Sequence, residues 1–286
     1  MRKKVLVTGA NGMLGQDLCP ILEDEGYEVV ETDIQNLDIT NPEMVGQVLN
    51  SEQPDIVIHC AAYTNVDKAE EDLGTARKIN AYGTENLAKV CGKKDITMVY
   101  ISTDYVFSGN GTKPYLPTDE TAPLNNYGLT KWEGEEAVRK YVPKHFITRT
   151  SWLYGIHGKN FVETMLSLAD KPELKVVDDQ IGCPTWTVEL SNGIVKILKT
   201  EDYGTYHICG SGKTSWYGFA KEIFDQYKKI SPSPLEGEGW GEGLKPCTTN
   251  EFPRLAKRPA YSVMENNKIC RNWKAALKDY LALREV

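Results

Sequence analysis

The sequence lacks any uninterrupted apolar run near the length that a membrane-spanning helix requires. Its first residues, MRKKVLVTGA, pass directly into a predicted strand, which leaves no room for the apolar segment of a secretory signal peptide. Basic residues are also in deficit, because 33 lysines and arginines stand against 40 aspartates and glutamates and give a formal net charge of −7. Nucleic-acid-binding proteins usually carry a basic footprint. We therefore expect a cytoplasmic protein that binds neither nucleic acid nor a membrane.

Paired cysteines of the kind that bind zinc or form disulfide frameworks are missing as well. The cysteines are odd in number, scattered and never spaced as CxxC: Cys19, Cys60, Cys91, Cys183, Cys209, Cys247 and Cys270. This usage predicts neither a disulfide framework nor a structural zinc site. It indicates small buried side chains in a reducing compartment.

What the sequence does contain is an alternation of apolar strands and amphipathic helices over its first half. Predicted strands lie at 3–9, 27–33, 55–62, from 97 onward and at 145–155, with predicted helices at 13–26, 42–53, 69–95 (one or two helices) and 126–142. Strands separated by helices of about ten or more residues imply a parallel, doubly wound sheet. We expect an α/β fold of the Rossmann type, in one or two domains.

Beyond residue 152 the pattern loosens into helices on short extended connectors, at 160–171, 187–200 and 214–230. We expect residues 1–152 to form the sheet domain and residues 153–286 to form mainly a smaller C-terminal lobe, with some segments free to return to the sheet. Residues 231–246, SPSPLEGEGWGEGLKP, are rich in Gly, Pro and Glu and have little to bury. Their composition predicts a flexible insertion, with a binding segment built on Trp240 as the alternative.

Three glycines punctuate the turn between the first strand and the first helix. Gly9, Gly12 and Gly15 form a GxxGxxG pattern, which permits a tight turn and a close approach of backbone to a pyrophosphate at the helix N-terminus. Asp33 follows at the end of the second strand, where a ribose hydroxyl would be bound. The alternative is a helix-capping turn without a ligand. With Asp33 in place, the pattern favours a nicotinamide dinucleotide.

Asp33 also bears on the choice of cofactor. A carboxylate repels a 2′-phosphate, and the next residue is Ile34 rather than an arginine that could pair with one. We expect NADH or NADPH, with a preference for NADH. The glycine spacing resembles that of the extended branch of the short-chain dehydrogenase/reductase superfamily.

A tyrosine and a lysine lie four residues apart on the predicted helix 126–142. This spacing places Tyr127 and Lys131 on one face. An ammonium beside a phenol lowers the pKa of the phenol and makes it a better proton shuttle. Thr103 follows the fourth strand, at the edge where open α/β sheets bind ligands. Each residue alone has a structural explanation, but together they predict an oxidoreductase site.

Longer motifs make the resemblance more specific. They include VTGANGMLGQDL, DIVIHCAAYTNVDKAE, YISTDYVFSGNG, APLNNYGLTKWEGE, VDDQIGCPT and RPAYSV. Over nearly its whole length the chain resembles the dTDP-4-dehydrorhamnose reductases. The resemblance implies reduction of the 4-keto group of dTDP-4-dehydro-6-deoxy-L-mannose to dTDP-L-rhamnose, with Tyr127 as proton donor.

The resemblance also implies a role for individual residues. The catalytic residues would be Thr103, Tyr127 and Lys131. The cofactor would be bound by Gly9, Asn11, Gly12, Met13, Leu14, Gly15, Asp33, Asp38, Ile39, Ala61, Ala62, Tyr63, Tyr127 and Lys131. The dTDP-sugar would be bound by Thr64, Val66, Thr103, Asp104, Tyr105, Tyr127 and Trp152.

Some of these residues have competing structural interpretations. Trp152 is also compatible with a core position, Asp38 with an N-cap and Asp104 with a turn cap. In the segment RLAKRPAYSV, Arg254 and Arg258 are candidate diphosphate ligands.

Family members that dimerise around Mg²⁺ use acidic side chains. Asp17 and Glu189 fall near matching positions, but the ligand set is incomplete and we predict no metal site. We expect a monomer or a homodimer.

Two other functions compete with the reductase. One is another extended short-chain reductase, epimerase or dehydratase acting on a nucleotide sugar, although the sequence TDYVF has no glutamate beside Asp104 of the kind that dehydratases use. The other is a non-catalytic NADP-binding regulatory subunit. Such a subunit has no need of a proton donor, so the intact set of Thr103, Tyr127 and Lys131 favours an enzyme.

Overall fold

The computed structural model describes residues 2–230, 241–266 and 268–284. Within them, six parallel strands form a central sheet in the order β10-β5-β4-β3-β1-β2. Their bounds are β1 Lys4–Thr8, β2 Glu28–Thr32, β3 Ile56–His59, β4 Thr97–Thr103, β5 His145–Thr150 and β10 Gly204–His207. The chain forms β2 on one side of β1 and β3 on the other. This reversal opens a crevice at the carboxyl end of β1, where open α/β sheets bind ligands. The expected Rossmann-type sheet is confirmed.

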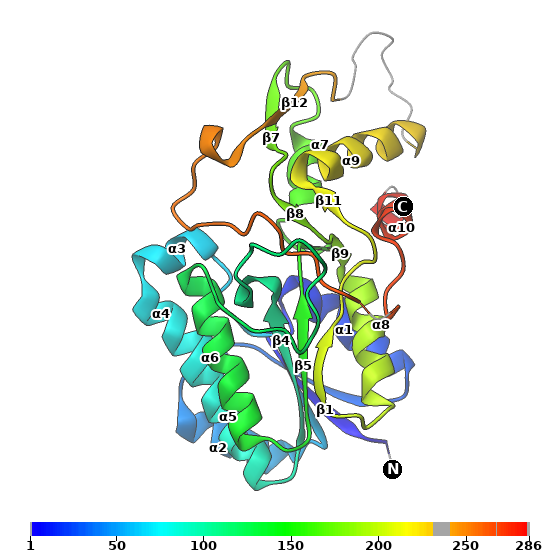
Figure 1. The fold of residues 1–286 in the computed structure, drawn as a ribbon. Coiled ribbons are helices and arrows are strands. Elements are labelled where there is room, and N and C mark those ends of the chain that lie inside the picture. Colours follow the sequence, from blue (N-terminus) through cyan, green and yellow to red (C-terminus); the bar gives the residue numbers. More distant parts are fainter. Residues whose placement is uncertain (1, 231–240, 267, 285–286) are drawn as a thin grey trace.

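Helices cover both faces of the sheet (Figure 1). On one face lie α1 (Met13–Asp24) and α8 (Thr187–Leu198), and on the other α2 (Pro42–Glu52), α5 (Thr84–Lys93) and α6 (Asn126–Tyr141). Successive residues of a strand point to opposite faces. Accordingly, Val5 and Val7 pack in the layer with α1 and α8, whereas Leu6 packs in the layer with α2 and α5.

The predicted helical segment 69–95 is an almost continuous run of short helices. It consists of α3 (Val66–Glu71), α4 (Leu73–Arg77), a π-helix (Lys78–Gly83) and α5. The break after α3 falls at Asp72, whose side chain accepts a hydrogen bond from the backbone N–H of Thr75 and so caps α4.

A second lobe sits beyond the carboxyl ends of the strands, at the top of Figure 1. It contains small two-stranded pairings, β6–β9, β8–β11 and β7–β12, and three helices that surround an aromatic-rich core. The strands are β6 Leu153–Tyr154, β7 Leu174–Val177, β8 Ile181–Gly182, β9 Thr185–Trp186, β11 Thr214–Ser215 and β12 Leu244–Cys247. The helices are α7 Phe161–Ser167, α9 Trp216–Ile230 and α10 Trp273–Arg284, and short 3₁₀ turns lie at Asp104–Val106 and Thr249–Glu251.

Two elements from the second half of the chain belong to the sheet layers. Strand β10 pairs in parallel with β5, and α8 packs against α1. Leu190 and Ile194 of α8 are fully buried in the same cluster as Leu18 of α1. The chain therefore enters the second lobe, returns to the sheet and then leaves it again.

The predicted flexible insertion at 231–246 divides into two parts. Residues 231–240 lie outside the described residues. For 244–246 the expectation is wrong, because Leu244 and Pro246 belong to β12, which pairs in parallel with β7. The N–H of Gly241 donates to the carbonyl of Ala169, which ties this strand to the end of α7.

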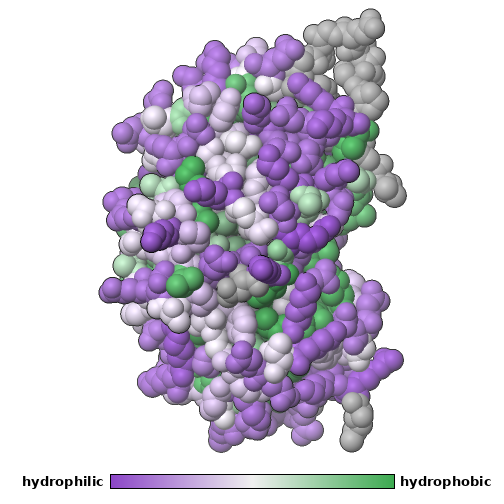
Figure 2. Space-filling model, turned by 45° about the vertical axis from the view of Figure 1, so that its right-hand side comes forward, coloured by the Kyte–Doolittle hydropathy of each residue, from purple (hydrophilic) through white to green (hydrophobic). Residues whose placement is uncertain are grey.

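The surface and the cysteines agree with the composition. The face seen in Figure 2 is largely hydrophilic, with hydrophobic side chains gathered near the middle of its height. All seven cysteines are free thiols, and all except Cys60 are buried. In the part of the chain that the structure describes, no helix is both long and apolar enough to cross a membrane.

Candidate active site

A cavity of about 740 Å³ lies at the carboxyl ends of the strands, where the sheet meets the second lobe. Most of the predicted site residues line it: Gly9, Gly12, Met13, Leu14, Gly15, Asp33, Asp38, Ile39, Ala61, Ala62, Thr64, Val66, Thr103, Asp104, Tyr105, Tyr127, Lys131 and Trp152. Asn11 and Tyr63 are not among its lining residues. The structure therefore gathers one site from segments that are far apart in the sequence.

The glycine turn needs its glycines for close packing. Gly9 has a φ of +66°, and a Cβ there would lie 2.7 Å from the backbone nitrogen of Ala61. A Cβ on Gly15 would lie 2.4 Å from the carbonyl oxygen of Ala10. The turn thus brings bare backbone to the cavity at the N-terminus of α1, where unpaired N–H groups favour an anion. These features fit the pyrophosphate of a dinucleotide.

Asp33 braces this turn. Its carboxylate accepts hydrogen bonds from the backbone N–H of Asn11, at 3.1 Å, and from that of Ile34, at 2.7 Å. Asn11 therefore contributes through its backbone contact with Asp33 rather than by lining the cavity. Asp33 is also one of the residues that line the cavity.

Asp38 is not the N-cap of α2. Its Oδ1 accepts hydrogen bonds from the backbone N–H and the hydroxyl of Thr40, at 2.9 and 2.8 Å. The cap is Asn41, whose side chain accepts from two backbone N–H groups of the first turn. The N-cap alternative for Asp38 is wrong, and Asp38 lies at the cavity wall.

The loop after β3 is fixed by a residue that sequence reasoning missed. Asn80, in the π-helix, accepts a hydrogen bond from the N–H of Tyr63 at 2.8 Å and donates to its carbonyl at 3.0 Å. Asn80 is 1 % exposed and also donates to the hydroxyl of Thr130 on α6. Tyr63 thus anchors the loop that carries Ala61, Ala62 and Thr64 to the cavity.

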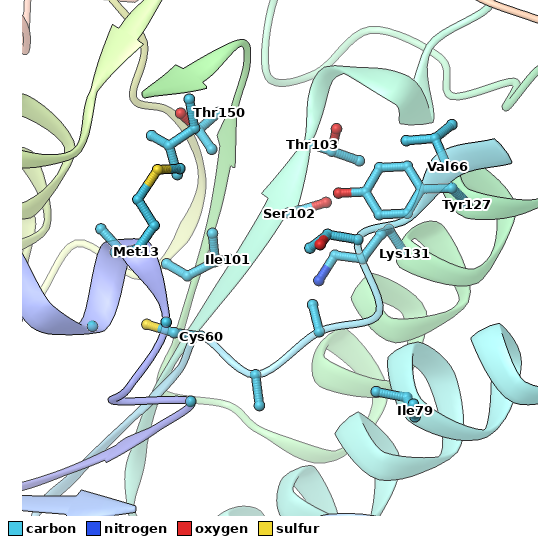
Figure 3. Close-up of a pocket in the computed structure, with 18 of the residues that line it drawn as sticks. Met13, Cys60, Val66, Ile79, Ile101, Ser102, Thr103, Tyr127, Lys131 and Thr150 are labelled. Carbon is cyan, nitrogen blue, oxygen red and sulfur yellow. The ribbon is translucent and has the colours of Figure 1, made fainter. Parts of the chain in front are cut away.

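Thr103, Tyr127 and Lys131 meet on one side of the cavity, opposite Met13 and Thr150 (Figure 3). Helix α6 presents Tyr127 and Lys131 from its first two turns, and Asn125 caps it by accepting the N–H of Gly128. A Cβ on Gly128 would lie 2.2 Å from the carbonyl oxygen of Tyr105, so α6 packs directly against the turn after β4. This close contact brings the helix residues next to Thr103.

The turn after β4 uses both Thr103 and Asp104. The Thr103 hydroxyl accepts the N–H of Tyr105 at 3.2 Å and donates to Oδ1 of Asp104 at 3.1 Å. Thr103, not Asp104, is therefore the cap of this turn. Oδ2 of Asp104 is buried and has no hydrogen-bond partner among the described residues. Burial raises the pKa of Asp104 to about 7, and the neighbouring hydroxyls of Ser262 and Thr103 oppose that rise.

Burial shifts Tyr127 and Lys131, both on α6, toward their neutral forms. It raises the pKa of Tyr127 to about 12, although the Thr103 hydroxyl acts in the opposite direction. It lowers the pKa of Lys131 to about 7, against the stabilising charge of Glu135. At neutral pH the phenol is protonated and able to donate.

A buried ion pair lies between α6 and β5. Nη2 of Arg149 on β5 lies 2.7 Å from Oε2 of Glu135 on α6, and both side chains are almost inaccessible to solvent. The hydroxyl of Ser102 donates to Oε1 of Glu135 at 2.6 Å, and Arg139 contacts Oε2 at 2.7 Å. Ser102 and Glu135 lie inside the quoted motifs YISTDYVFSGNG and APLNNYGLTKWEGE. Sequence reasoning missed the network because its members come from three elements and meet only in the folded chain.

Two indoles form the wall of the cavity nearest the second lobe. Trp152 and Trp216 stack with ring centroids 3.5 Å apart and an interplanar angle of 5°. Trp152 has a φ of +47°, which is uncommon for a bulky residue. A Cβ on Gly182 would lie 2.5 Å from the Trp152 ring, so the ring packs directly against the backbone of that glycine. Trp152 is partly exposed to the cavity rather than enclosed in the core. Trp216 was not predicted as a site residue.

The candidate diphosphate ligands have other contacts, although Nη1 of Arg258 is buried with no hydrogen-bond partner among the described residues. Nη2 of Arg258 lies 3.0 Å from Oδ2 of Asp67, and its guanidinium lies over the ring of Tyr105. The Arg254 guanidinium lies over the ring of Phe252. Neither arginine is among the residues that line the cavity.

The carboxylates considered for a metal have protein partners as well. Asp17 accepts a hydrogen bond from the Thr187 hydroxyl, and Glu189 lies 2.7 Å from the guanidinium of Arg271. Among the described residues, no group of three or more His, Cys, Asp or Glu side chains could hold a metal ion.

Comparison with known proteins places these features in a family. The model of the RmlD substrate binding domain family matches residues 2–285. A curated relative, the spore coat polysaccharide biosynthesis protein SpsK of Bacillus subtilis, is 41% identical over 288 residues, which cover 98% of each chain. The dTDP-4-dehydrorhamnose reductase of Aggregatibacter actinomycetemcomitans is 39% identical over 300 residues, which cover 99% of each chain.

A solved structure extends the likeness to three dimensions. The dTDP-4-dehydrorhamnose reductase of Bacillus anthracis, in complex with NADP, is 40% identical and superimposes with a TM-score of 0.91. The match covers 99% of this chain and 100% of that one. The similarity therefore spans both the sheet and the second lobe.

Proposed function

The chain belongs to the RmlD substrate binding domain family, and we propose that it is a dTDP-4-dehydrorhamnose reductase. It reduces the 4-keto group of dTDP-4-dehydro-6-deoxy-L-mannose to dTDP-L-rhamnose with NAD(P)H. The observation that carries the proposal is the meeting of Thr103, Tyr127 and Lys131 in the cavity that the glycine turn also lines. The names of the reductase relatives support the same reaction.

Tyr127 donates the proton in this proposal. The nicotinamide cofactor supplies a hydride to C4 of the sugar when it is bound. Negative charge then develops on the C4 oxygen, and Tyr127, held protonated because burial raises its pKa to about 12, protonates it. The Thr103 hydroxyl lies beside Tyr127. Its single hydrogen, which Asp104 accepts in this structure, would turn to the same C4 oxygen when the sugar is bound. Lys131 holds the ribose and stabilises charge on the phenol oxygen after proton transfer.

The remaining cavity residues divide into a cofactor half and a sugar half. On the cofactor half, Gly9 to Gly15 present backbone to the pyrophosphate, Asp33 meets the adenosine ribose, and Asp38 and Ile39 contact the adenine. Ala61, Ala62 and Tyr63 flank the nicotinamide, with Tyr63 holding the backbone of the loop. On the sugar half lie Thr64, Val66, Asp104, Tyr105 and Trp152. The polar sugar-side groups come from the ends of β3 and β4, where substrate and hydride would meet.

We infer a preference for NADH over NADPH from the position of Asp33. Its carboxylate faces the cavity at the end of β2, where it would repel a 2′-phosphate. The exposed Ile34 beside it offers no compensating cation. The NADP bound by the Bacillus anthracis relative supports a nicotinamide dinucleotide at this site, without setting the preference of this chain.

The test is turnover of dTDP-4-dehydrorhamnose, followed by loss of nicotinamide absorbance with each cofactor. We expect the wild type to turn over and Tyr127→Phe to lose at least about a hundredfold in kcat, because it lacks the general acid. NADH and NADPH binding, measured by fluorescence, should persist in the variant. The matched control is Tyr82→Phe, which removes the same hydroxyl from an exposed tyrosine outside the cavity and should leave kcat unchanged.

Two outcomes would contradict the proposal. Equal kcat in wild type and Tyr127→Phe would assign the proton to another group. Cofactor binding without turnover in the wild type would favour the regulatory subunit, or a different nucleotide sugar as substrate.

A further inference from the structure

Lys131 is buried, and no carboxylate among the described residues pairs directly with its ammonium, although the charge of Glu135 acts on it from a distance. The side chain is 3 % exposed. Its ammonium forms no ion pair and no hydrogen bond with any described residue, so all three N–H donors remain available. Burying an ammonium without compensation is costly and normally drives it toward the neutral amine. A direct contact that favours the charged form would add to the more distant charge of Glu135.

The side chain that contacts the ammonium of Lys131 directly is Tyr100, on β4. Nζ of Lys131 lies over the face of the Tyr100 ring, 4.1 Å from its centroid. Tyr100 is fully buried, and the ring of His59 packs beside it with centroids 5.6 Å apart. A cation this close to the face of an aromatic ring is attracted by the negative charge of that face.

The hydroxyl of Tyr100 fixes the ring relative to the catalytic helix. It donates to the carbonyl of Lys131 itself, at 3.2 Å, and lies 3.4 Å from the carbonyl oxygen of Asn80. A Cβ at Gly134 would lie 2.3 Å from this hydroxyl, so the glycine provides the space for it beneath α6. One side chain therefore contacts both ends of Lys131, its backbone carbonyl and its ammonium.

The other titratable groups around Lys131 do not provide an equivalent partner. Glu135 lies one turn along α6, but its carboxylate is already bound by Arg149, Arg139 and Ser102. His59, at the end of β3, is neutral because burial and the charge of Lys131 lower its pKa to about 3. Cys60 and Tyr127 remain protonated, because burial raises the pKa of each.

We propose that Tyr100 is the positioning residue of Lys131, with its ring face holding the ammonium charged at the floor of the cavity. A carboxylate in this place would occupy the N–H donors, whereas a ring face leaves them free for the ribose and for Tyr127. The activity readout of this inference rests on the proposed function, but its cofactor-binding readout does not.

The experiment compares side chains of similar shape at position 100. Tyr100→Phe keeps the ring face and removes the hydroxyl. Tyr100→pentafluorophenylalanine keeps a ring of similar shape but reverses the charge of its face, and Tyr100→Leu removes the ring. For each protein, NADPH affinity by fluorescence and kcat/KM with the dTDP-sugar are measured against pH. Thermal unfolding checks that each variant is folded. If Tyr100→Leu does not fold, the fluorinated variant still tests the role of the ring face.

We expect the loss of NADPH affinity at alkaline pH to mark deprotonation of Lys131. Without an attractive ring face the ammonium is less stable, so Lys131 loses its proton at lower pH. We call the pH range in which NADPH affinity falls at alkaline pH the alkaline limb. Its midpoint should therefore move down by about one pH unit in the fluorinated and Leu variants and stay in place in Tyr100→Phe. Lys131→Arg, which is charged at every accessible pH, should remove the limb from NADPH binding.

The inference is overturned if Tyr100→Phe shifts as far as the fluorinated variant, because the hydroxyl would then be responsible. It is also overturned if no ring variant moves the limb. If the wild type does not reduce the dTDP-sugar while the NADPH-binding limb shifts as expected, the proposed function fails and the role of Tyr100 stands.

Discussion

At the scale of single residues, the carboxylate of Asp33 combines a structural role with a proposed selective one. It accepts the N–H groups of Asn11 and Ile34 and so braces the glycine turn, and it also lines the cavity. A residue with both roles ties cofactor preference to the shape of the turn. Exchanging it for Asn removes the charge together with one of the two accepted hydrogen bonds.

We expect Asp33→Asn to raise the ratio of kcat/KM for NADPH to that for NADH by about tenfold. The amide keeps one acceptor oxygen but removes the charge, and relief of about 1.4 kcal/mol of repulsion gives that factor. Steady-state kinetics with both cofactors measures the ratio. The control is Asp38→Asn, on the adenine side of the proposed site, which should change both cofactors equally. A ratio unchanged by Asp33→Asn would show that the carboxylate does not select against a 2′-phosphate.

Several single-residue features were within reach of the sequence and others were not. Thr103, Tyr127 and Lys131 belong to recognisable spacings, and the structure brings all three to one cavity. No spacing in the sequence singles out Tyr100, Asn80 or Trp216, although Tyr100 is the first residue of the motif YISTDYVFSGNG. Their importance comes from neighbours that are remote in sequence. Trp216, for example, stacks on Trp152 although 63 residues lie between them in the chain.

At the scale of elements, α6 matters most because it carries Tyr127 and Lys131. It approaches the sheet closely enough that glycine is required at two of its contacts. At Gly128 the neighbour is the backbone of Tyr105, and at Gly134 it is the hydroxyl of Tyr100 together with the carbonyl of Asn80. The distance of α6 from β4 and from the turn that follows it therefore sets the positions of Tyr127 and Lys131.

We expect Gly134→Ala to destabilise the protein by about 1–3 kcal/mol and to lower kcat, because the added methyl pushes α6 away from Tyr100. Chemical denaturation and turnover of the dTDP-sugar measure the two effects. Gly46→Ala is the matched control, since nothing lies within 4 Å of a Cβ at that position of α2. It should instead stabilise by about 0.5–1 kcal/mol, as alanine does in a helix interior. Equal effects of the two substitutions would contradict the close-packing argument.

At the scale of the whole molecule, the two halves of the chain are interleaved. The boundary at residue 152 follows the change of sequence pattern, yet β10 and α8 complete the sheet from the far side of that boundary. Without them, β5 becomes an open edge and the layer of α1 loses Leu190 and Ile194. The later segments therefore contribute both a strand and a helix to the sheet layers.

Accordingly, we expect the fragment 1–152 not to fold cooperatively by itself. Urea unfolding followed by circular dichroism should show a sigmoidal transition for the full chain and a broad, non-cooperative change for the fragment. The control is the same fragment co-expressed with residues 153–286, which should recover solubility if the missing elements are the cause. A sharp transition of the isolated fragment would instead establish residues 1–152 as an independent domain.

The sequence by itself determined the alternation of strands and helices, the glycine turn and the spacing of Tyr127 and Lys131. These features depend on local periodicity and on neighbours within a few residues, and both can be read along the chain. Only the tertiary structure decided that Asp38 does not cap α2, that residues 244–246 form a strand, and that β10 and α8 return to the sheet. It also decided the partner of Lys131, a ring on another element. Pairing and packing between distant segments depend on which buried surfaces fit together, and that information lies in no single stretch of the chain.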